Sequence, residues 1–262
     1  MPMYVGLDIG SRSAKAVVLD DQDNTKWTII DTEPEIELTA KKALATVLDE
    51  AGIKQSDVAY TIATGYGRVV VSFAPSVTEI TCHAKGAAWF DPEVRLILDV
   101  GGQDSKAIRC NSEGKVLAFA LNEKCAAGTG RYLERVAETL GVPVDQVGTL
   151  ALQGTKPVLI SSFCAVFGQN EVVGFLRDGR SLADILAGTC AATVRRQLSL
   201  LHKVGMNGKL MFCGGVAKNI GVVKMLEEQT GAAVCTSPEP QIVGAVGAAL
   251  IARERARRGN RQ

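Results

Sequence analysis

The sequence predicts an α/β protein with a duplicated fold, in which two lobes lie around a cleft. Residues 7–17 read LDIGSRSAKAV and residues 98–108 read LDVGGQDSKAI, so Leu, Asp, Gly, Lys and Ala recur in register. Strand-like segments alternate with helical ones along 262 residues. A further Gly-Gly turn follows an apolar run at Gly214 and Gly215. Two copies of one strand-turn-strand unit indicate a duplicated domain.

The first half is expected to begin with a hairpin, because β-branched residues flank its Gly-Ser-Arg-Ser turn. Its elements in order are strands at 3–10, 14–20 and 27–31, a helix at 39–51 that Gly52 ends, and a strand at 58–64. The loop Thr64-Gly65-Tyr66-Gly67-Arg68 follows this last strand.

The second half restarts with a strand at 94–99. Its other expected elements are a meander over 109–120, a strand at 157–161, a strand at 210–213, and helices at 132–140, after Cys164, at 181–203, at 222–228 and at 242–258. Small residues in the last helix would allow another backbone to approach closely. One lobe is predicted as 1–94 plus 240–262, and the other as 95–239.

Three carboxylates at or just after strand ends, those of Asp8, Asp99 and Asp104, are candidates to hold the hydrated magnesium of a nucleotide. The two turns supply candidate phosphate donors. These are Gly10, Ser11, Arg12, Ser13, Ala14 and Lys15 in the first turn, and Gly101, Gly102 and Gln103 in the second. Two capped hairpins without a ligand are the alternative. Walker-type and dinucleotide fingerprints are absent from the sequence.

Cysteine usage adds a second kind of chemistry. The seven cysteines are an odd number, and no leader peptide precedes them, so reduced thiols or metal ligands are expected. Cys125 precedes a small-residue helix start, and Cys164 lies at a strand-to-helix corner with Phe163 and Phe167 as apolar cover. In both settings the helix dipole would stabilise a thiolate. The remaining cysteines are expected to pack: Cys82, Cys110, Cys190, Cys213 and Cys235.

No Cys-x-x-Cys pair occurs, so no local motif could hold a complete four-cysteine cluster. Two ligands per chain would suffice in a symmetric dimer, with Cys125 and Cys164 from each protomer. Two structural thiols are the alternative that spacing alone leaves open.

The two hairpins and the Gly-Gly turn resemble those of the actin-like ATPase superfamily. This resemblance spans nearly the whole chain and implies binding of ATP or ADP with Mg²⁺. It also implies a hinge where the 242–250 helix packs. The implied adenosine contacts are Gly214, Gly215, Ala217, Asn219 and Gln241.

Three longer segments are similar to the activator (activase) family of 2-hydroxyacyl-CoA dehydratases, which includes the ATPase subunits of benzoyl-CoA reductase. They are Asn122-Glu123-Lys124-Cys125-Ala126-Ala127-Gly128-Thr129-Gly130-Arg131, Ser161-Ser162-Phe163-Cys164-Ala165-Val166-Phe167 and the 64–68 loop. Two positions depart from the family pattern. Arg12 stands where a Thr is usual, and Gln169 stands where many members carry an acidic residue.

The activator resemblance implies a homodimer bridged by one 4Fe-4S cluster on Cys125 and Cys164. Such a dimer would use ATP to push single electrons onto an iron–sulfur partner. This partner would be a 2-hydroxyacyl-CoA dehydratase, a benzoyl-CoA-type reductase or a related cluster-bearing reductase, with a ferredoxin or flavodoxin as the electron source. ATP is expected to close the cleft, and Asp104 or Gln103 to position the hydrolytic water.

Composition excludes other partners. The formal net charge is +1, so no global field recruits nucleic acid or an anionic membrane. No apolar run is long enough to span a bilayer, and a cytoplasmic protein is expected. Two functions stay open beside the activator: a sugar or small-metabolite kinase with incidental thiols, and a nucleotide-gated regulatory module.

Overall fold

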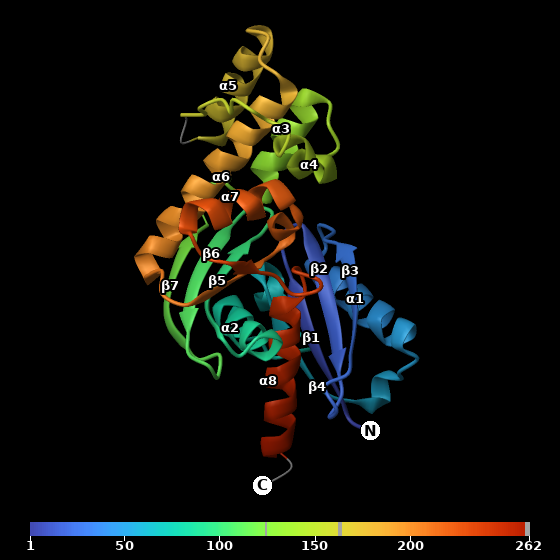
Figure 1. The fold of residues 1–262 in the computed structure, drawn as a ribbon. Helices are drawn as coiled ribbons and strands as arrows, with labels where there is room; N and C mark the ends of the chain where they lie inside the picture. Colours follow the sequence, from blue (N-terminus) through green and yellow to red (C-terminus); the bar gives the residue numbers. More distant parts are fainter. Residues whose placement is uncertain (124, 162–163, 260–262) are drawn as a thin grey trace. The chain divides into compact units, whose positions relative to one another are not determined.

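The computed structural model describes residues 1–123, 125–161 and 164–259 (Figure 1). The chain forms two compact units, each described by itself. The first comprises Met1–Arg95, Cys110–Leu117 and Ser237–Gln262, and the second comprises Leu96–Arg109 and Ala118–Thr236. The lobes, 1–94 with 240–262 and 95–239, were predicted from the expected nucleotide site. The two units are divided by the contacts within each part of the chain, so the lobes stay a prediction.

A four-stranded sheet forms the centre of the first unit, in the order β3-β2-β1-β4. The strands are β1 (Met3–Ile9), β2 (Ser13–Leu19), β3 (Thr25–Asp31) and β4 (Val58–Thr64). β2 pairs antiparallel with β1 and with β3, whereas β4 pairs parallel with β1. The four strands expected for this half are confirmed.

Helices cover both faces of this sheet (Figure 1). α1 (Ile36–Ala51) packs on the face that carries Val5 and Leu7, and Gly52 ends it in the left-handed conformation. α8 (Val243–Gly259) packs on the opposite face, beside α2 (Glu79–Phe90). A Cβ at Gly6 would collide with the backbone of Ala245. The close backbone approach expected of the last helix is confirmed.

The five-stranded sheet has the order β7-β6-β5-β8-β9. Its strands are β5 (Val94–Val100), β6 (Ser105–Cys110), β7 (Val116–Asn122), β8 (Lys209–Cys213) and β9 (Val234–Cys235). The helices of the second unit are α3 (Gly130–Leu140), α4 (Val147–Ala151), α5 (Ala165–Arg177), α6 (Leu182–Val204) and α7 (Ile220–Thr230). One apolar core joins strands and helices here, with Leu98 and Phe212 fully buried among helix residues such as Leu186 and Leu201.

One expected strand did not form, and two helices, α2 and α4, were missed. Residues 157–161 are not a strand, because their backbone groups bond to helices α5 and α6 instead of to a strand. The Val158 amide donates to the Asp184 carbonyl, and Arg195 donates to the Ile160 carbonyl. The helix α2 was missed, because its alanine and glycine residues blur the apolar stripe. Thr78 caps it by accepting a hydrogen bond from the Thr81 amide.

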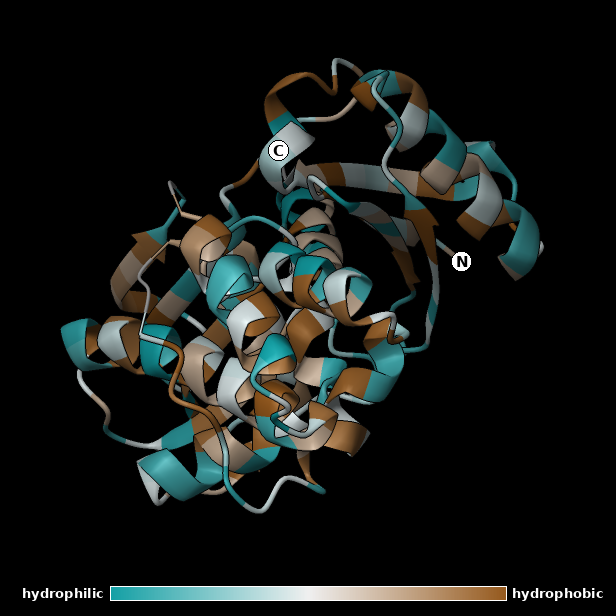
Figure 2. Cartoon of the chain, turned by 90° about the horizontal axis from the view of Figure 1, so that it is seen from above, coloured by the Kyte–Doolittle hydropathy of each residue, from teal (hydrophilic) through white to brown (hydrophobic). Residues whose placement is uncertain are grey.

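Most helices carry both hydrophobic and hydrophilic stretches, seen as brown and teal along each ribbon in Figure 2. This distribution is expected of helices that cover a core on one side and meet water on the other. Within residues 1–123, 125–161 and 164–259, no helix combines the length and the apolar character needed to cross a membrane.

Candidate nucleotide and cluster sites

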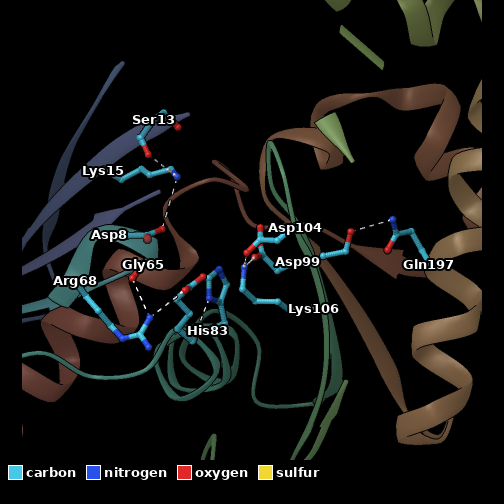
Figure 3. Close-up of polar contacts among 12 residues, drawn as sticks. Asp8, Ser13, Lys15, Gly65, Arg68, His83, Asp99, Asp104, Lys106 and Gln197 are labelled. Atoms are coloured by element: carbon cyan, nitrogen blue, oxygen red, sulfur yellow. Dashed lines mark hydrogen bonds and ion pairs between the residues drawn. The ribbon is translucent and has the colours of Figure 1, made fainter. Parts of the chain in front are cut away.

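The repeated sequence builds the same hairpin twice, and we name residues 8–15 hairpin 1 and residues 99–106 hairpin 2. In hairpin 1, Asp8 lies opposite Lys15 across the antiparallel pair. In hairpin 2, Asp99 lies opposite Lys106 in the same register. Each hairpin therefore places a carboxylate and an ammonium side by side (Figure 3).

Both turns close in the same way. The amide of Gly10 donates to the carbonyl of Ser13 at 3.1 Å, and the amide of Gly101 donates to the carbonyl of Asp104 at 3.0 Å. Arg12 and Gln103 occupy corresponding positions at the two tips, and both side chains are exposed. Tips of this kind can present backbone N–H groups to an anion. The Ala14 side chain is buried in the core against α1, so only its backbone is available to a ligand.

The charges of the two hairpins differ. Lys15 Nζ is 3.7 Å from Asp8 Oδ2 and donates to the Ser13 carbonyl at 3.1 Å. Lys106 Nζ is 3.2 Å from Asp99 Oδ2 and 2.7 Å from Asp104 Oδ2. The Lys106 side chain is 5% exposed and that of Lys15 is 12% exposed. The cation of hairpin 2 is thus held between two carboxylates inside the fold.

A second repeated feature, which the sequence reasoning missed, lies beside each aspartate. Gly65 follows β4 with φ 87° and ψ 177°, and Gly214 follows β8 with φ 82° and ψ 177°. A Cβ at Gly65 would stand 2.6 Å from the Ile9 carbonyl oxygen and 2.5 Å from Asp8 Oδ1. At Gly214 a Cβ would stand 2.8 Å from Asp99 Oδ1. A strand followed by Gly, at Thr64-Gly65 and Cys213-Gly214, was the available signal.

His83 is another residue near Asp8 whose place the sequence did not predict. It is buried on α2, and its Nδ1 lies 3.0 Å from the Glu79 carbonyl oxygen. A Cβ at Gly244 would stand 2.8 Å from His83 Cε1 and 3.2 Å from Asp8 Oδ2. The imidazole and the carboxylate, both labelled in Figure 3, therefore lie near the same glycine of α8.

The residues expected to contact adenosine fall into two groups. Gly214 precedes a short 3₁₀ turn that contains Gly215 and Ala217. The Asn219 side chain accepts from the Val222 amide at 3.0 Å and so caps α7. Gln241 belongs to the first unit, where its Nε2 donates to Ser13 Oγ at 3.5 Å. Its contact is therefore with hairpin 1.

Cys164 lies where a thiolate is favoured. It is the exposed N-cap residue of α5, and the backbone N–H groups of Phe167 and Val166 lower the pKa of its thiol. The expected apolar cover is wrong for Phe167, whose side chain is 64% exposed because it lies on the outer side of the first helical turn. Phe163 lies outside the described residues.

Cys125 precedes α3, as expected, but it lies five residues before Gly130, where the helix begins, and Thr129 occupies the N-cap position. Cys125 is partly buried against the core of the second unit. Its carbonyl accepts from Asn122 Nδ2 at 2.9 Å. Glycine at 128, with φ 82°, lets the chain turn sharply between Cys125 and the helix.

Two motif thiols per chain are the number of donors that a cluster shared between two chains would need. Among the described residues, no group of three or more His, Cys, Asp or Glu side chains could hold a metal within one chain. Burial raises the pKa of Cys82 and of Cys190 to about 12, and burial raises that of Cys213 well above its usual range. Buried thiols of this kind are poor ligands, and packing is confirmed for these three. The two accessible motif thiols, Cys125 and Cys164, remain the candidates.

Comparison with known proteins gives consistent relatives. The model of the BadF/BadG/BcrA/BcrD ATPase family matches residues 5–252. The chain is 40% identical over 258 residues to the activator of lactoyl-CoA dehydratase from Anaerotignum propionicum. This match covers 98% of this chain and 100% of that relative.

Solved structures agree with these sequence matches. Component A of the (R)-2-hydroxyglutaryl-CoA dehydratase from Acidaminococcus fermentans superposes with a TM-score of 0.94 at 37% identity, covering 98% of this chain and 100% of that one. The activator of 2-hydroxyisocaproyl-CoA dehydratase from Clostridium difficile, with bound ADPNP, gives 0.93 at 33% identity, covering 99% and 97%.

More distant structures share only the fold. An ethanolamine utilization protein from Carboxydothermus hydrogenoformans and a ROK family glucokinase from Streptomyces griseus each give a TM-score of 0.61, at 14% and 15% identity. The predicted actin-like ATPase fold is confirmed. The resemblance to activators of 2-hydroxyacyl-CoA dehydratases and to benzoyl-CoA reductase is confirmed as well.

Proposed function

Because the chain belongs to the BadF/BadG/BcrA/BcrD ATPase family, we propose that it is an ATP-dependent activator of a partner iron–sulfur enzyme. Its relatives over nearly the whole chain are activators of 2-hydroxyacyl-CoA dehydratases and a benzoyl-CoA reductase subunit. The observation that carries the proposal is the pair of motif cysteines in the same unit as hairpin 2.

In this proposal each hairpin contributes to binding MgATP. The turn N–H groups of each hairpin donate to phosphate oxygens, and Asp8 and Asp99 lie one residue before the ends of their strands, where they can bind waters of the magnesium ion. Lys15 lies farther from its aspartate than Lys106 and is the ammonium better placed to donate to phosphate. Asp104 or the exposed Gln103 orients the hydrolytic water. The adenosine contacts are assigned to Gly214, Gly215, Ala217, Asn219 and Gln241.

Cys125 and Cys164 of two protomers would hold one 4Fe-4S cluster in a homodimer. When bound, this cluster supplies single electrons of low potential. The Phe167 and Val166 amides favour the thiolate form of Cys164, which is the form that binds iron. The Asn122 side chain fixes the backbone at Cys125.

The partner in this proposal is a 2-hydroxyacyl-CoA dehydratase, a benzoyl-CoA-type reductase or a related reductase that bears its own clusters. A ferredoxin or flavodoxin would supply the electrons. The relatives support the choice of partner, because they are named for dehydratases and for a reductase.

The decisive experiment measures iron and acid-labile sulfide per chain on protein purified without oxygen, together with its mass in solution. We expect about two irons and two sulfides per chain in a dimer. Cys125→Ser and Cys164→Ser should each lose the iron and the dimer together, whereas Cys235→Ser should keep both. Metal-free monomer that binds ATP normally would contradict the proposal.

A further inference from the structure

The turn of hairpin 2 is hydrogen-bonded to the segment that starts at Cys125, which we define as residues 125–131 and name the Cys125 segment. The Gly130 amide donates to the Gly101 carbonyl at 2.9 Å, and the Arg131 amide donates to the Gly102 carbonyl at 2.9 Å. Thr129 Oγ1 also donates to the Gly102 carbonyl, at 3.0 Å. Both carbonyls of the Gly-Gly turn are thus bound by the chain that carries Cys125.

Thr129 has two acceptors for one proton. Its hydroxyl lies 3.0 Å from the Gly102 carbonyl oxygen and 2.7 Å from the carbonyl oxygen of Ala126, the residue directly after Cys125. A hydroxyl carries a single hydrogen, so strengthening one of these bonds weakens the other. Thr129 is fully buried, and water does not compete for that hydrogen. This side chain therefore links the position of the turn to the backbone beside Cys125.

Gln197 of α6 joins the same two elements from another side. Its Nε2 donates to the Gly128 carbonyl at 2.5 Å and to Ser105 Oγ, the first residue of β6, at 3.2 Å. The side chain is 1% exposed, and within the described part of the chain its Oε1 has no hydrogen-bond partner. A buried amide with an unsatisfied oxygen is costly, which marks a position held for more than packing.

Close packing limits how the Cys125 segment can move. A Cβ at Gly128 would stand 2.8 Å from Arg196 Cβ, so the backbone there lies directly on α6. A displacement of the turn must therefore pass along the segment toward Cys125, because the segment cannot bulge toward α6.

The segment before Cys164 is held by other residues. Its Ser161 amide and hydroxyl donate to the Glu171 carboxylate at 2.8 and 3.0 Å, and its Ile160 carbonyl accepts from Arg195 at 2.7 Å. These partners lie on α5 and α6. In the described part of the chain, hairpin 2 is thus hydrogen-bonded to the Cys125 side of the cysteine pair.

We propose that Thr129 and Gln197 are positioning residues that transmit the nucleotide state of hairpin 2 to Cys125. A phosphate bound to the turn N–H groups reorients the Gly101 and Gly102 peptide units, and the Thr129 hydroxyl then shifts its hydrogen bond between Gly102 and Ala126. The Cys125 backbone moves as a result. This inference rests on the proposed nucleotide binding, but it needs no cluster to be tested.

Hairpin 1 supplies a matched control. Thr32 Oγ1 donates to the Gly10 carbonyl at 2.8 Å, and the Thr32 amide donates to the Arg12 carbonyl at 3.0 Å. Thr32 thus binds the turn of hairpin 1 as Thr129 binds that of hairpin 2, but the chain after Thr32 leads to α1. Thr32→Val removes the same kind of bond without touching the Cys125 segment.

The experiment measures the alkylation rate of Cys125 by iodoacetamide in cluster-free protein, with peptide mass spectrometry. Saturating MgADP and a non-hydrolysable MgATP analogue are compared. In the natural protein we expect the two rates to differ by about fivefold or more. Thr129→Val and Gln197→Leu should bring the ratio close to one, whereas Thr129→Ser and Thr32→Val should keep it.

The outcomes separate this inference from the proposed function. If Thr129→Val and Gln197→Leu, folded by circular dichroism, keep the natural ratio, or if Thr32→Val loses it, the assignment is wrong. If the natural protein binds both nucleotides by calorimetry yet alkylates at one rate, the coupling is absent while the proposed function stands. If neither nucleotide binds, the proposed function itself fails, and this inference with it.

Discussion

Hairpin 1 and hairpin 2 share a backbone and differ in what that backbone holds. In both, an aspartate faces a lysine across the strands, and a glycine amide closes the turn. Hairpin 2 carries Asp104 where hairpin 1 carries Ser13, so Lys106 has two carboxylate partners and Lys15 has one at longer range. The duplication thus preserved the turn while the charge around it diverged.

The attachments of the two turns differ as well. A threonine binds a turn carbonyl in each case, Thr32 in hairpin 1 and Thr129 in hairpin 2. The chain after Thr32 continues into an ordinary amphipathic helix, whereas Cys125 lies just before Thr129. The comparison teaches that one turn can be built twice and held by a threonine each time, while only one copy is joined to a segment that carries a cysteine.

The largest difference is expected when the two lysines are replaced. Lys106→Met leaves Asp99 and Asp104 without their shared ammonium inside the fold, which should cost about 3–5 kcal/mol of the free energy of unfolding. Lys15→Met removes a pair at 3.7 Å and one bond to a carbonyl, which should cost about 1–2 kcal/mol. Urea unfolding followed by circular dichroism measures both. Equal losses would show that the hairpins are electrostatically equivalent.

The sequence predicted what depends on local pattern. The repeat at 7–17 and 98–108 does form two hairpins with one register, because the tight turn between the strands fixes the register of a hairpin. The helix ends at Gly52 and the small residues of α8 were predictable for similar reasons.

Other features depend on tertiary contacts and could not be predicted locally. Residues 157–161 have a strand-like sequence. Their backbone groups instead form hydrogen bonds with Arg195 and with the Asp184 carbonyl, which are distant in sequence. The helix expected at 132–140 begins two residues earlier, at Gly130, with Thr129 at its N-cap position, because contacts of this segment with the turn of hairpin 2 extend it. The role of Gly65 emerged only when β4 was seen beside β1, which brings Gly65 against Asp8.

Glycine replacement tests whether the glycine after the strand, Gly65 in one unit and Gly214 in the other, is required to the same degree in both units. Gly65→Ala and Gly214→Ala each place a Cβ against a backbone carbonyl, at φ and ψ values that only glycine readily adopts. Each should lower the free energy of unfolding by about 2–4 kcal/mol. Gly141→Ala is the matched control, since its φ is 66° with open space around it. It should cost about 1 kcal/mol in the same urea titration. If Gly65→Ala lowered the free energy of unfolding no more than Gly141→Ala does, Gly65 and Gly214 would not be equivalent.

The smallest effect concerns the thiols, which differ between the units as the hairpins do. The first unit buries Cys82, whose thiol pKa burial raises to about 12, whereas the second unit exposes Cys164, whose pKa two backbone N–H groups lower. Alkylation requires the thiolate. As pH falls, Cys164 should therefore keep reacting below the pH at which an ordinary exposed thiol becomes protonated. Cys82 should stay unreactive up to pH 9 or so, because it is still a thiol there.

The measurement is the iodoacetamide rate of each cysteine peptide between about pH 6 and 9 in cluster-free protein. A Cys164 profile centred at or above that of a denatured-state cysteine peptide would show that the α5 amides do not stabilise its thiolate.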